Sequence, residues 1–398
     1  MNRWLVLFLI MNGLAACRTG RPPLNSNVNA PNSCVSRDGL SIVTYNTGLA
    51  PGLVPFAKAR LAPVAEALAA TDFDLMCLQE VWPDDYARAV VKGIRQASGD
   101  DVSVYSTDTR GLGETGQDLC TQREFDFMAN CARDSCQKLG NEELAGCVMR
   151  ECRLRGFILY QQARPCLNCL IATVGESLPD VERICVSRKG ASRVYGGSNG
   201  VMLISRLPLR NVETVSLRSS GANRVALLAT VDAGARGTFE VACTHLSSQN
   251  VVSPTYPGFS DWEEEQTDQV RAISERLSAR AGTTGRQIFI GDLNTSWEHG
   301  INQDNQVGVW KEILRLGFRS AEDQRASFCS SCADNELRDS ESNCLIDHVL
   351  LRQPADDGRL SPVCVERLYD GYVTIRSPTG LPLQTRLSDH YGLRVILR

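Results

Sequence analysis

The sequence predicts an α+β fold in which two sheets pack face to face and helices cover their outer faces. Short apolar runs rich in β-branched residues recur along the chain, and few helical patterns lie between them. The 398 residues are 43% hydrophobic and 22% charged, which is ordinary for a globular protein with a sizeable core. The net charge of −4 argues against a surface that binds nucleic acid throughout, although a cleft can be locally basic.

Residues 1–16 are predicted to be an export signal. Arg3 gives the positive start, and the apolar run WLVLFLIM is too short to span a bilayer. The LAAC motif that ends at Cys17 resembles the lipobox of bacterial lipoproteins, in which the cysteine carries lipid after cleavage. Residues 17–38 would then be a lipid anchor and flexible tether. We expect a membrane-anchored protein on the periplasmic or outer face; the alternative is plain secretion.

The core elements are predicted in chain order from their periodicity. Strands are expected where apolar and β-branched residues run together, at 41–46, 74–78, 102–105, 200–205, 224–231, 239–244, 288–290, 345–351 and 393–397. Helices are expected where apolar residues recur at helical spacing, at 55–70 and 84–97. A further helix begins at the capping-box sequence SDWE (260–263) and presents Val270, Ile273 and Leu277 on one face.

Residues 107–195 interrupt this series and hold eight of the 16 cysteines. Two helical stretches flank the turn at Gly140-Asn141, and four cysteines lie symmetrically about it. An antiparallel helical hairpin would bring these cysteines together in two nested pairs, Cys131 with Cys152 and Cys136 with Cys147. We therefore predict a disulfide-rich helical insertion at 107–195.

A zinc module is the alternative interpretation of some of these cysteines. The pairs Cys166-x-x-Cys169 and Cys329-x-x-Cys332 each have the spacing of zinc ligands. They lie far apart in the chain, and an exported protein favours disulfides, so we prefer bridges.

Three other cysteines carry separate expectations. Cys77 and Cys243 lie inside apolar strands, and we expect packed thiols there rather than bridges. If Cys17 is lipidated, 16 − 1 leaves 15 cysteines, so one thiol should be free or paired with another chain.

A candidate site begins at 288–297, which reads IFIGDLNTSW. Three apolar residues form a buried strand, and Gly291 allows the backbone to turn. Asp292 and Asn294 follow, two residues apart, and in an extended segment such residues point to the same side. A carboxylate and an amide facing one point would suit a metal ion or a phosphoryl group.

Other predicted strands also end in polar residues, namely Asn46, Glu80, His245, Asp347, Asp389 and His390. Three of the four histidines fall in these segments. His299 lies in a polar loop and is expected at the surface. His348 directly follows Asp347, so it should point away from the cleft, because neighbours in a strand face opposite ways.

The ordered motifs TYNTG, LQEVW, SNGVMLISRLPL, THLSSQ, GDLNTSW, LIDHVLL and SDHYGL carry a family resemblance. Together they resemble the endonuclease/exonuclease/phosphatase superfamily, the fold of DNase I-like nucleases, sphingomyelinases and inositol-phosphate phosphatases. The resemblance implies a four-layer α/β/β/α sandwich of two packed, mainly antiparallel sheets over residues 39–398. The cysteine-rich insertion at 107–195 has no counterpart in that pattern.

The resemblance also implies a metal site. Glu80 would hold a Mg²⁺ ion, with Asn46 beside it and Asp389 supporting the metal side; Mn²⁺ or Ca²⁺ are alternatives. The ion would bind phosphate oxygens and neutralise charge in the transition state.

The remaining roles follow from the same resemblance. His390 would be the general base that activates water, and Asp347 would fix its tautomer. Asp292 would position the water or assist the leaving group. Asn294 and His245 would donate hydrogen bonds to phosphoryl oxygens, and Asn199 would contact substrate.

We therefore expect a monomeric, Mg²⁺-dependent phosphodiester hydrolase. The motifs LQEVW and NGVMLISRLPL and the Glu-rich helix after THL look most like sphingomyelinase-like members, which favours a phospholipid such as sphingomyelin. The alternatives are a DNase I-like nuclease acting on nucleic acid, an inositol-phosphate phosphatase, and a non-catalytic surface-binding lipoprotein. The complete set of catalytic residue types argues against the last.

Overall fold

The computed structural model describes residues 39–99, 102–107, 119–136, 141–187, 194–219, 222–248, 255–281, 285–297, 307–322, 329–338, 343–354, 360–377 and 380–398. The predicted export signal, Cys17, the tether, Gly140 and His299 lie outside these residues. None of the helices in the described ranges is both long enough and apolar enough to cross a bilayer.

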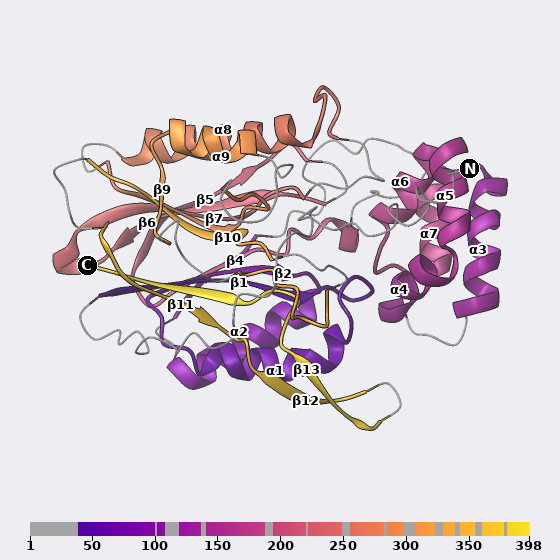
Figure 1. Cartoon of the computed structure of the whole chain (residues 1–398), viewed down its shortest axis with the longest axis horizontal. Coiled ribbons are helices and arrows are strands. Elements are labelled where there is room, and N and C mark those ends of the chain that lie inside the picture. Colours follow the sequence, from indigo (N-terminus) through magenta and orange to yellow (C-terminus); the bar gives the residue numbers. More distant parts are fainter. Residues whose placement is uncertain are drawn as a thin grey trace, which may run out of the picture.

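The first of two large sheets has the strand order β11-β14-β1-β2-β4-β3 (Figure 1). Its strands are β1 (Leu40–Leu49), β2 (Leu75–Val81), β3 (Ser103–Tyr105), β4 (Met202–Ser205), β11 (Pro362–Leu368) and β14 (Gly392–Leu397). Only the central pair, β1 and β2, is parallel; the other neighbours are antiparallel. Every residue of β1 is buried, as expected for a strand covered on both faces.

The second sheet repeats this plan with the order β5-β6-β7-β8-β10-β9. Its strands are β5 (Leu209–Ser216), β6 (Val225–Asp232), β7 (Thr238–His245), β8 (Gln287–Asp292), β9 (Arg319–Ser320) and β10 (Asp347–Arg352). Here β7 and β8 form the parallel pair, and the other neighbours are antiparallel. Each sheet therefore has one central parallel pair whose carboxyl ends lie at one edge.

Apolar side chains from both sheets form the central core, and a helical layer covers each outer face (Figure 1). Helices α1 (Ala57–Ala69) and α2 (Asp84–Ser98) pack on the first sheet. Helices α8 (Trp262–Ala281) and α9 (Val307–Arg315) pack on the second. The predicted four-layer α/β/β/α sandwich of an α+β protein is confirmed.

The cysteine-rich segment forms a separate group of helices beside one end of the sandwich (Figure 1). The helices are α3 (Gln122–Cys136), α4 (Asn141–Glu151), α5 (Arg153–Gln162), α6 (Arg164–Ala172) and α7 (Leu178–Cys185). Four disulfides hold them: Cys131–Cys152, Cys136–Cys147, Cys120–Cys166 and Cys169–Cys185. The two nested pairs are confirmed. The zinc alternative is wrong, because each cysteine of both Cys-x-x-Cys pairs is disulfide-bonded.

The helical group is packed against the loop that follows β1. A Cβ added to Gly146 of α4 would lie 3.1 Å from the carbonyl oxygen of Gly52. The Tyr195 hydroxyl donates to the carbonyl of Pro51 (2.7 Å), and its ring stacks on Trp82 with centroids 5.3 Å apart. The insertion therefore contacts the ends of β1 and β2.

Cys77 and Cys243 form a disulfide, so the prediction of packed thiols is wrong. The two residues lie on β2 and β7, whose facing sides meet across the central core with a Cα–Cα distance of 5.5 Å. The sequence does not reveal which strands of different sheets face each other. All cysteines in the described part of the chain are bonded, so the expected odd thiol is not among them.

The start of α8 also differs slightly from the prediction. Asp261 rather than Ser260 caps the helix, because its Oδ1 accepts from the backbone N–H of Glu264 (2.8 Å). The Glu264 carboxylate returns to the backbone N–H of Ser260 (2.7 Å). The N-cap therefore lies one residue later than predicted, and the carboxylate of Glu264 accepts from the residue before the N-cap rather than from the N-cap itself.

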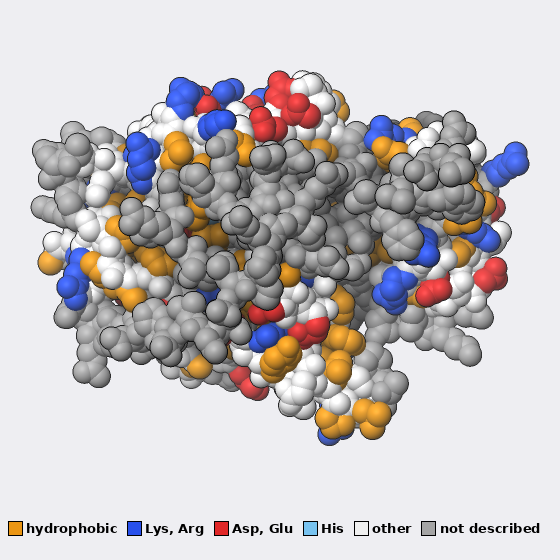
Figure 2. Space-filling model, in the orientation of Figure 1, with side chains coloured by type: hydrophobic (Ala, Val, Ile, Leu, Met, Phe, Trp, Pro, Cys, Tyr) orange, Lys and Arg blue, Asp and Glu red, His pale blue; other side chains and the backbone are white. Residues whose placement is uncertain are grey.

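The strands β12 (Tyr372–Arg376) and β13 (Pro382–Arg386) form a two-stranded hairpin outside both sheets. The sequence analysis missed it because its strands are short and largely exposed. Hydrophobic side chains gather over the lower edge of the molecule where this hairpin lies (Figure 2); Tyr372 is 56% and Leu381 66% exposed. The hairpin leads directly into Asp389 and His390.

Removing the inter-sheet disulfide tests its part in holding the sandwich together. The Cys77→Ala/Cys243→Ala variant should lose about 2–4 kcal/mol of unfolding free energy, because this crosslink closes a long loop. Denaturant titration measures the loss. The Cys136→Ala/Cys147→Ala variant removes a disulfide of the helical insertion whose cysteines are only 11 residues apart. It should leave the unfolding transition of the sandwich nearly unchanged. Equal effects of the two variants on that transition would show that the Cys77–Cys243 disulfide has no special part in stabilising the sandwich.

Candidate active site

Asp292 lies at the centre of the candidate site, at the end of β8. The strand register places His245 of β7 beside it on one side and Asp347 of β10 on the other. Residues opposite one another on adjacent strands share a face, so these side chains converge. Gly291 makes the close strand approach possible, since a Cβ there would lie 2.0 Å from the Thr244 carbonyl oxygen.

Asn46 joins this group to the other sheet. Its Nδ2 donates to Asp292 Oδ2 (3.0 Å) and to Glu80 Oε1 (3.2 Å). Its Oδ1 accepts from the backbone N–H of Gly48 (3.1 Å), which fixes the amide orientation. Asn46 thus bridges two carboxylates as a donor and directs its oxygen toward the backbone.

Glu80 is placed by an irregularity at the end of the β1–β2 pair. The register shifts between Asn46 and Leu49, and Glu80 has a φ of 57°, a left-handed conformation that non-glycine residues seldom adopt. Burial raises the pKa of Glu80 to about 7, and the nearby Asp389 carboxylate adds to the rise. The opposing effects of His390, Asn46 and Arg224 are smaller. Glu80 and Asp389 therefore form a pair of like charges.

His390 forms a close pair with Asp347. Its Nδ1 lies 2.8 Å from Asp347 Oδ2 and 4.0 Å from Asp292 Oδ2. Burial disfavours a charged imidazole, but Asp347, Asp292 and Asp389 together outweigh it and raise the pKa of His390 to about 10. Burial, followed by Asp347, raises the pKa of Asp292 to about 6. The site therefore concentrates negative charge around one histidine.

His245 is neutral and lies on the other side of Asp292. Its Nε2 is 3.3 Å from Asp292 Oδ2. Burial, and then the charges of Arg224 and His390, hold the pKa of His245 well below its usual value. Its buried Nδ1 has no hydrogen-bond partner among the described residues.

Asn294 does not share the extended geometry that was expected for it. Its φ is 49°, a left-handed conformation that asparagine tolerates, so the chain turns immediately after Asp292. The backbone N–H of Asn294 donates to Asp292 Oδ1 (3.0 Å), and its side-chain Nδ2 donates to the Leu246 carbonyl (3.1 Å). In this structure Asn294 orients Asp292 through its backbone.

Asn199, the predicted substrate contact, makes its side-chain hydrogen bonds to backbone groups. Its Nδ2 donates to the Thr107 carbonyl (2.6 Å), and its Oδ1 accepts from the backbone N–H of Val201 (2.9 Å). It is buried and braces the ends of β3 and β4.

His348 points away from the other site residues, as predicted. It is fully buried, and its Nε2 lies 2.9 Å from the Thr295 carbonyl oxygen. Its ring packs against Trp297 and Trp310, with centroid distances of 5.7 and 4.9 Å.

The sequence analysis missed Arg224, which directly precedes the apolar strand β6. It is 9% exposed, lies near the charges of Glu80 and Asp292, and its Nη1 has no hydrogen-bond partner in the described part of the chain. Arg60 provides a contrast, since backbone carbonyls satisfy its buried guanidinium. A buried N–H group without a hydrogen-bond partner is costly unless a ligand accepts from it. An arginine at the start of an otherwise apolar strand was the available signal.

The donors of the site suit a divalent cation. Ligand atoms of Asp292, Asp347 and His390 all lie within 4.8 Å of one another, and such a group could hold a metal ion. The carboxylates of Glu80 and Asp389, close enough to interact electrostatically, add further oxygen donors, which Mg²⁺ and Ca²⁺ prefer. Burial, followed by the nearby Asp389 carboxylate, raises the pKa of Glu80, and a bound cation would stabilise both carboxylates in their charged form.

The fold and this cluster at the strand ends define a DNase I-like α/β sandwich. A sequence profile described as the Endonuclease/Exonuclease/phosphatase family matches residues 43–390. The match spans most of the chain, and the chain belongs to this family.

Several solved structures share this fold. The protein SmcL is similar with a TM-score of 0.54 and 11% identity, covering 91% of this chain and 99% of that one. Sphingomyelinase C from Streptomyces griseocarneus has a TM-score of 0.51 and 17% identity, covering 90% and 99%. A mutant beta toxin from Staphylococcus aureus with bound magnesium ions has a TM-score of 0.50 and 12% identity, covering 90% and 100%. No curated protein sequence matches the chain.

The raised pKa of Glu80 predicts a pH-dependent cost to stability. The folded protein binds this proton more tightly than the unfolded chain, so the favourable contribution is present below pH 4.5 and is lost as the pH rises to about 7. In EDTA, Glu80→Gln should match the wild type near pH 4.5 and be more stable by about 1–3 kcal/mol at pH 8. Denaturant titration at both pH values measures this.

The control is Glu66→Gln, an exposed glutamate on α1, which should change stability little at either pH. If Glu80→Gln were no more stable than the wild type at pH 8, the charge crowding inferred for the site would be refuted.

Proposed function

We propose that this protein is a metal-dependent phosphodiester hydrolase. The observation that carries the proposal is the Asp347–His390 pair, which lies beside Asp292 and the Glu80–Asp389 carboxylates. A histidine oriented by a carboxylate can accept a proton from water, and adjacent carboxylates can hold a cation. Membership of the Endonuclease/Exonuclease/phosphatase family supports the same reading.

The proposed metal ligands are Glu80 and Asp389, with Asn46 keeping Glu80 in place. Their hard oxygen donors favour Mg²⁺, with Mn²⁺ or Ca²⁺ as alternatives. The bound ion would supply positive charge to phosphate oxygens and to the developing transition state. The bound magnesium ions of the fold-related beta toxin support this choice.

His390 is the proposed general base. Its Nδ1–H donates to Asp347, which leaves Nε2 as the atom that takes the proton from water. The pKa of about 10 reflects the surrounding carboxylates, so neutralising those carboxylates brings the histidine nearer to neutrality. Asp292, with its own pKa raised to about 6, would position the water or assist the leaving group.

Three residues are proposed to hold the phosphoryl group. Arg224 would place its unpartnered Nη1 on a phosphoryl oxygen, and His245 would donate from Nε2, the nitrogen that lies beside Asp292. Asn294 would contribute once its side chain leaves the Leu246 carbonyl. Donors fixed before the reaction stabilise the charge that builds up on these oxygens.

We infer that the substrate is a phospholipid such as sphingomyelin. The fold likeness to a sphingomyelinase C supports this class. The β12–β13 hairpin ends three residues before Asp389. Its exposed apolar side chains add physical support, because they suit contact with a lipid surface. We also propose that the protein is exported and anchored through lipidated Cys17, since its many disulfides are typical of exported proteins. Residues 39–398 would form one catalytic unit, with 107–195 inserted in it.

A substrate panel tests the proposed function. Purified protein with Mg²⁺ should hydrolyse bis-p-nitrophenyl phosphate and sphingomyelin vesicles in preference to plasmid DNA, RNA or inositol phosphates. EDTA should stop turnover, and added Mg²⁺ should restore it. Activity on DNA alone would replace the lipid assignment with a nuclease. No turnover of any substrate would favour a non-catalytic binding protein.

Substitutions test the proposed roles separately. His390→Ala and Glu80→Ala should each lower kcat by about 1,000-fold or more while leaving circular dichroism unchanged, because both act on the reacting groups. Arg224→Gln should raise KM and weaken inhibition by inorganic phosphate about tenfold or more. Arg218→Gln, an exposed arginine paired with Asp268, is the control and should behave as the wild type. Near-normal turnover by either alanine variant would refute the mechanism.

A further inference from the structure

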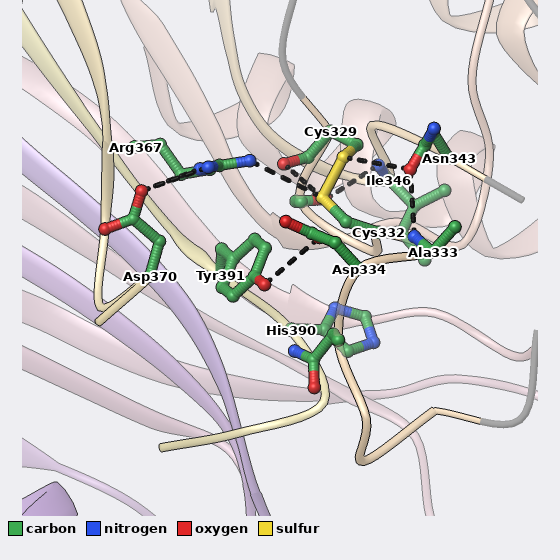
Figure 3. Close-up of a disulfide and its surroundings, with 12 residues drawn as sticks. Cys329, Cys332, Ala333, Asp334, Asn343, Ile346, Arg367, Asp370, His390 and Tyr391 are labelled. Atoms are coloured by element: carbon green, nitrogen blue, oxygen red, sulfur yellow. Dashed lines mark hydrogen bonds and ion pairs between the residues drawn. A yellow bond between two sulfur atoms is a disulfide. The ribbon is translucent and has the colours of Figure 1, made fainter. Parts of the chain in front are cut away.

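The Cys329–Cys332 disulfide closes a small loop that lies near His390 (Figure 3). Cys332 is fully buried and Cys329 is half-buried. The proposed function assigns no part to this loop. Its Cys-x-x-Cys spacing was a candidate zinc motif, but the disulfide bond leaves neither thiolate free to bind zinc.

Ser330, between the two cysteines, contacts both segments that carry the pair. Its hydroxyl oxygen accepts from the backbone N–H groups of Ile346 (3.1 Å) and Asp347 (3.2 Å). Its carbonyl accepts from the backbone N–H of Tyr391 (2.7 Å), the residue after His390. One residue, 2% exposed, thus holds the backbone on both sides of the Asp347–His390 hydrogen bond.

The rest of the loop continues this clamp around His390. Asp334 accepts from the Tyr391 hydroxyl (3.2 Å; Figure 3), and Asn335 donates to the Ser388 carbonyl (2.8 Å). The residues on either side of Asp389-His390 are therefore tied to one short segment.

The disulfide itself is supported from two directions (Figure 3). Arg367 Nη1 lies 3.7 Å from Cys332 Sγ, and Asn343 Oδ1 lies 3.5 Å from Cys329 Sγ. Asn343 Oδ1 also accepts from the backbone N–H of Ala333 (2.8 Å). The crosslink restricts the conformations of the loop and so fixes where Ser330 can lie.

We propose that Ser330, held by the Cys329–Cys332 disulfide, is a positioning residue for the Asp347–His390 pair. It does not touch the reacting atoms; it sets the separation of the two strand ends from which the carboxylate and the imidazole project. A small misplacement of a general base lowers the rate with little effect on substrate binding. The inference rests on the proposed function for its kinetic consequence, but the geometric claim stands apart from it.

The test compares Ser330→Ala with Ser331→Ala, which removes the neighbouring buried hydroxyl. Ser330→Ala should lower kcat for bis-p-nitrophenyl phosphate about 10–100-fold and change KM less than about twofold. Ser331→Ala should leave both constants unchanged. Ser330→Thr, which keeps the accepting oxygen, should restore most of kcat.

The disulfide is tested by Cys329→Ala/Cys332→Ala, with Cys136→Ala/Cys147→Ala as the control pair. The Cys329→Ala/Cys332→Ala variant should lower kcat as much as Ser330→Ala does. Adding Ser330→Ala to it should lower kcat little further, because both changes act through one loop. The control pair should retain wild-type kcat. Additive losses would show that the disulfide and Ser330 act separately and would overturn this part of the proposal.

A spectroscopic readout keeps the geometric claim independent of activity. In histidine-labelled protein, the Nδ1–H proton of His390 should give a downfield resonance from its hydrogen bond to Asp347, and Ser330→Ala should shift or broaden it. If the wild type hydrolyses no phosphodiester, the proposed function fails while this measurement still decides the positioning claim. An unchanged resonance and unchanged kcat in Ser330→Ala, or equal losses in Ser331→Ala, would overturn it.

Discussion

The hydrogen bond from Asn46 to Asp292 joins the two sheets at the point where the polar side chains converge. The two residues are 246 positions apart in the chain. Asp292 ends β8 and Asn46 lies near the end of β1, and each of these strands belongs to a central parallel pair. Because parallel strands present their carboxyl ends at one edge, packing the two sheets face to face brings four strand ends together. The positions of Glu80, His245 and Asp347 all follow from that one arrangement.

This arrangement concentrates acidic groups in a place that water reaches poorly. Asp292, Asp347, Glu80 and Asp389 surround His390, and the pKa values of Glu80 and Asp292 rise as a result. A site of this kind stores unfavourable free energy in the folded protein and releases it when a cation binds. Arg224 adds the opposite charge close by, so the site has separate places for a cation and for an anion.

The framework around these groups is rigid. Gly291 allows β7 to approach β8, Cys77–Cys243 joins the sheets below the site, and the Cys329–Cys332 loop holds the segments above it. The disulfide-rich helices pack through Tyr195 on Trp82, close to Glu80. Precise placement of reacting groups requires such support, because small displacements cost large factors in rate.

The sequence by itself determined the layered fold, the strand ends that carry Asn46, Glu80, His245, Asp292, Asp347 and His390, and the nested disulfides of the helical hairpin. These features follow from local periodicity and from symmetric spacing within a short segment. Only the tertiary structure decided that Cys77 bonds Cys243, that Asn294 turns out of the strand, and that Arg224 and Ser330 lie beside the site. Periodicity assigns a residue to one face of its own strand, whereas these contacts depend on which elements, far apart in the chain, are packed against each other.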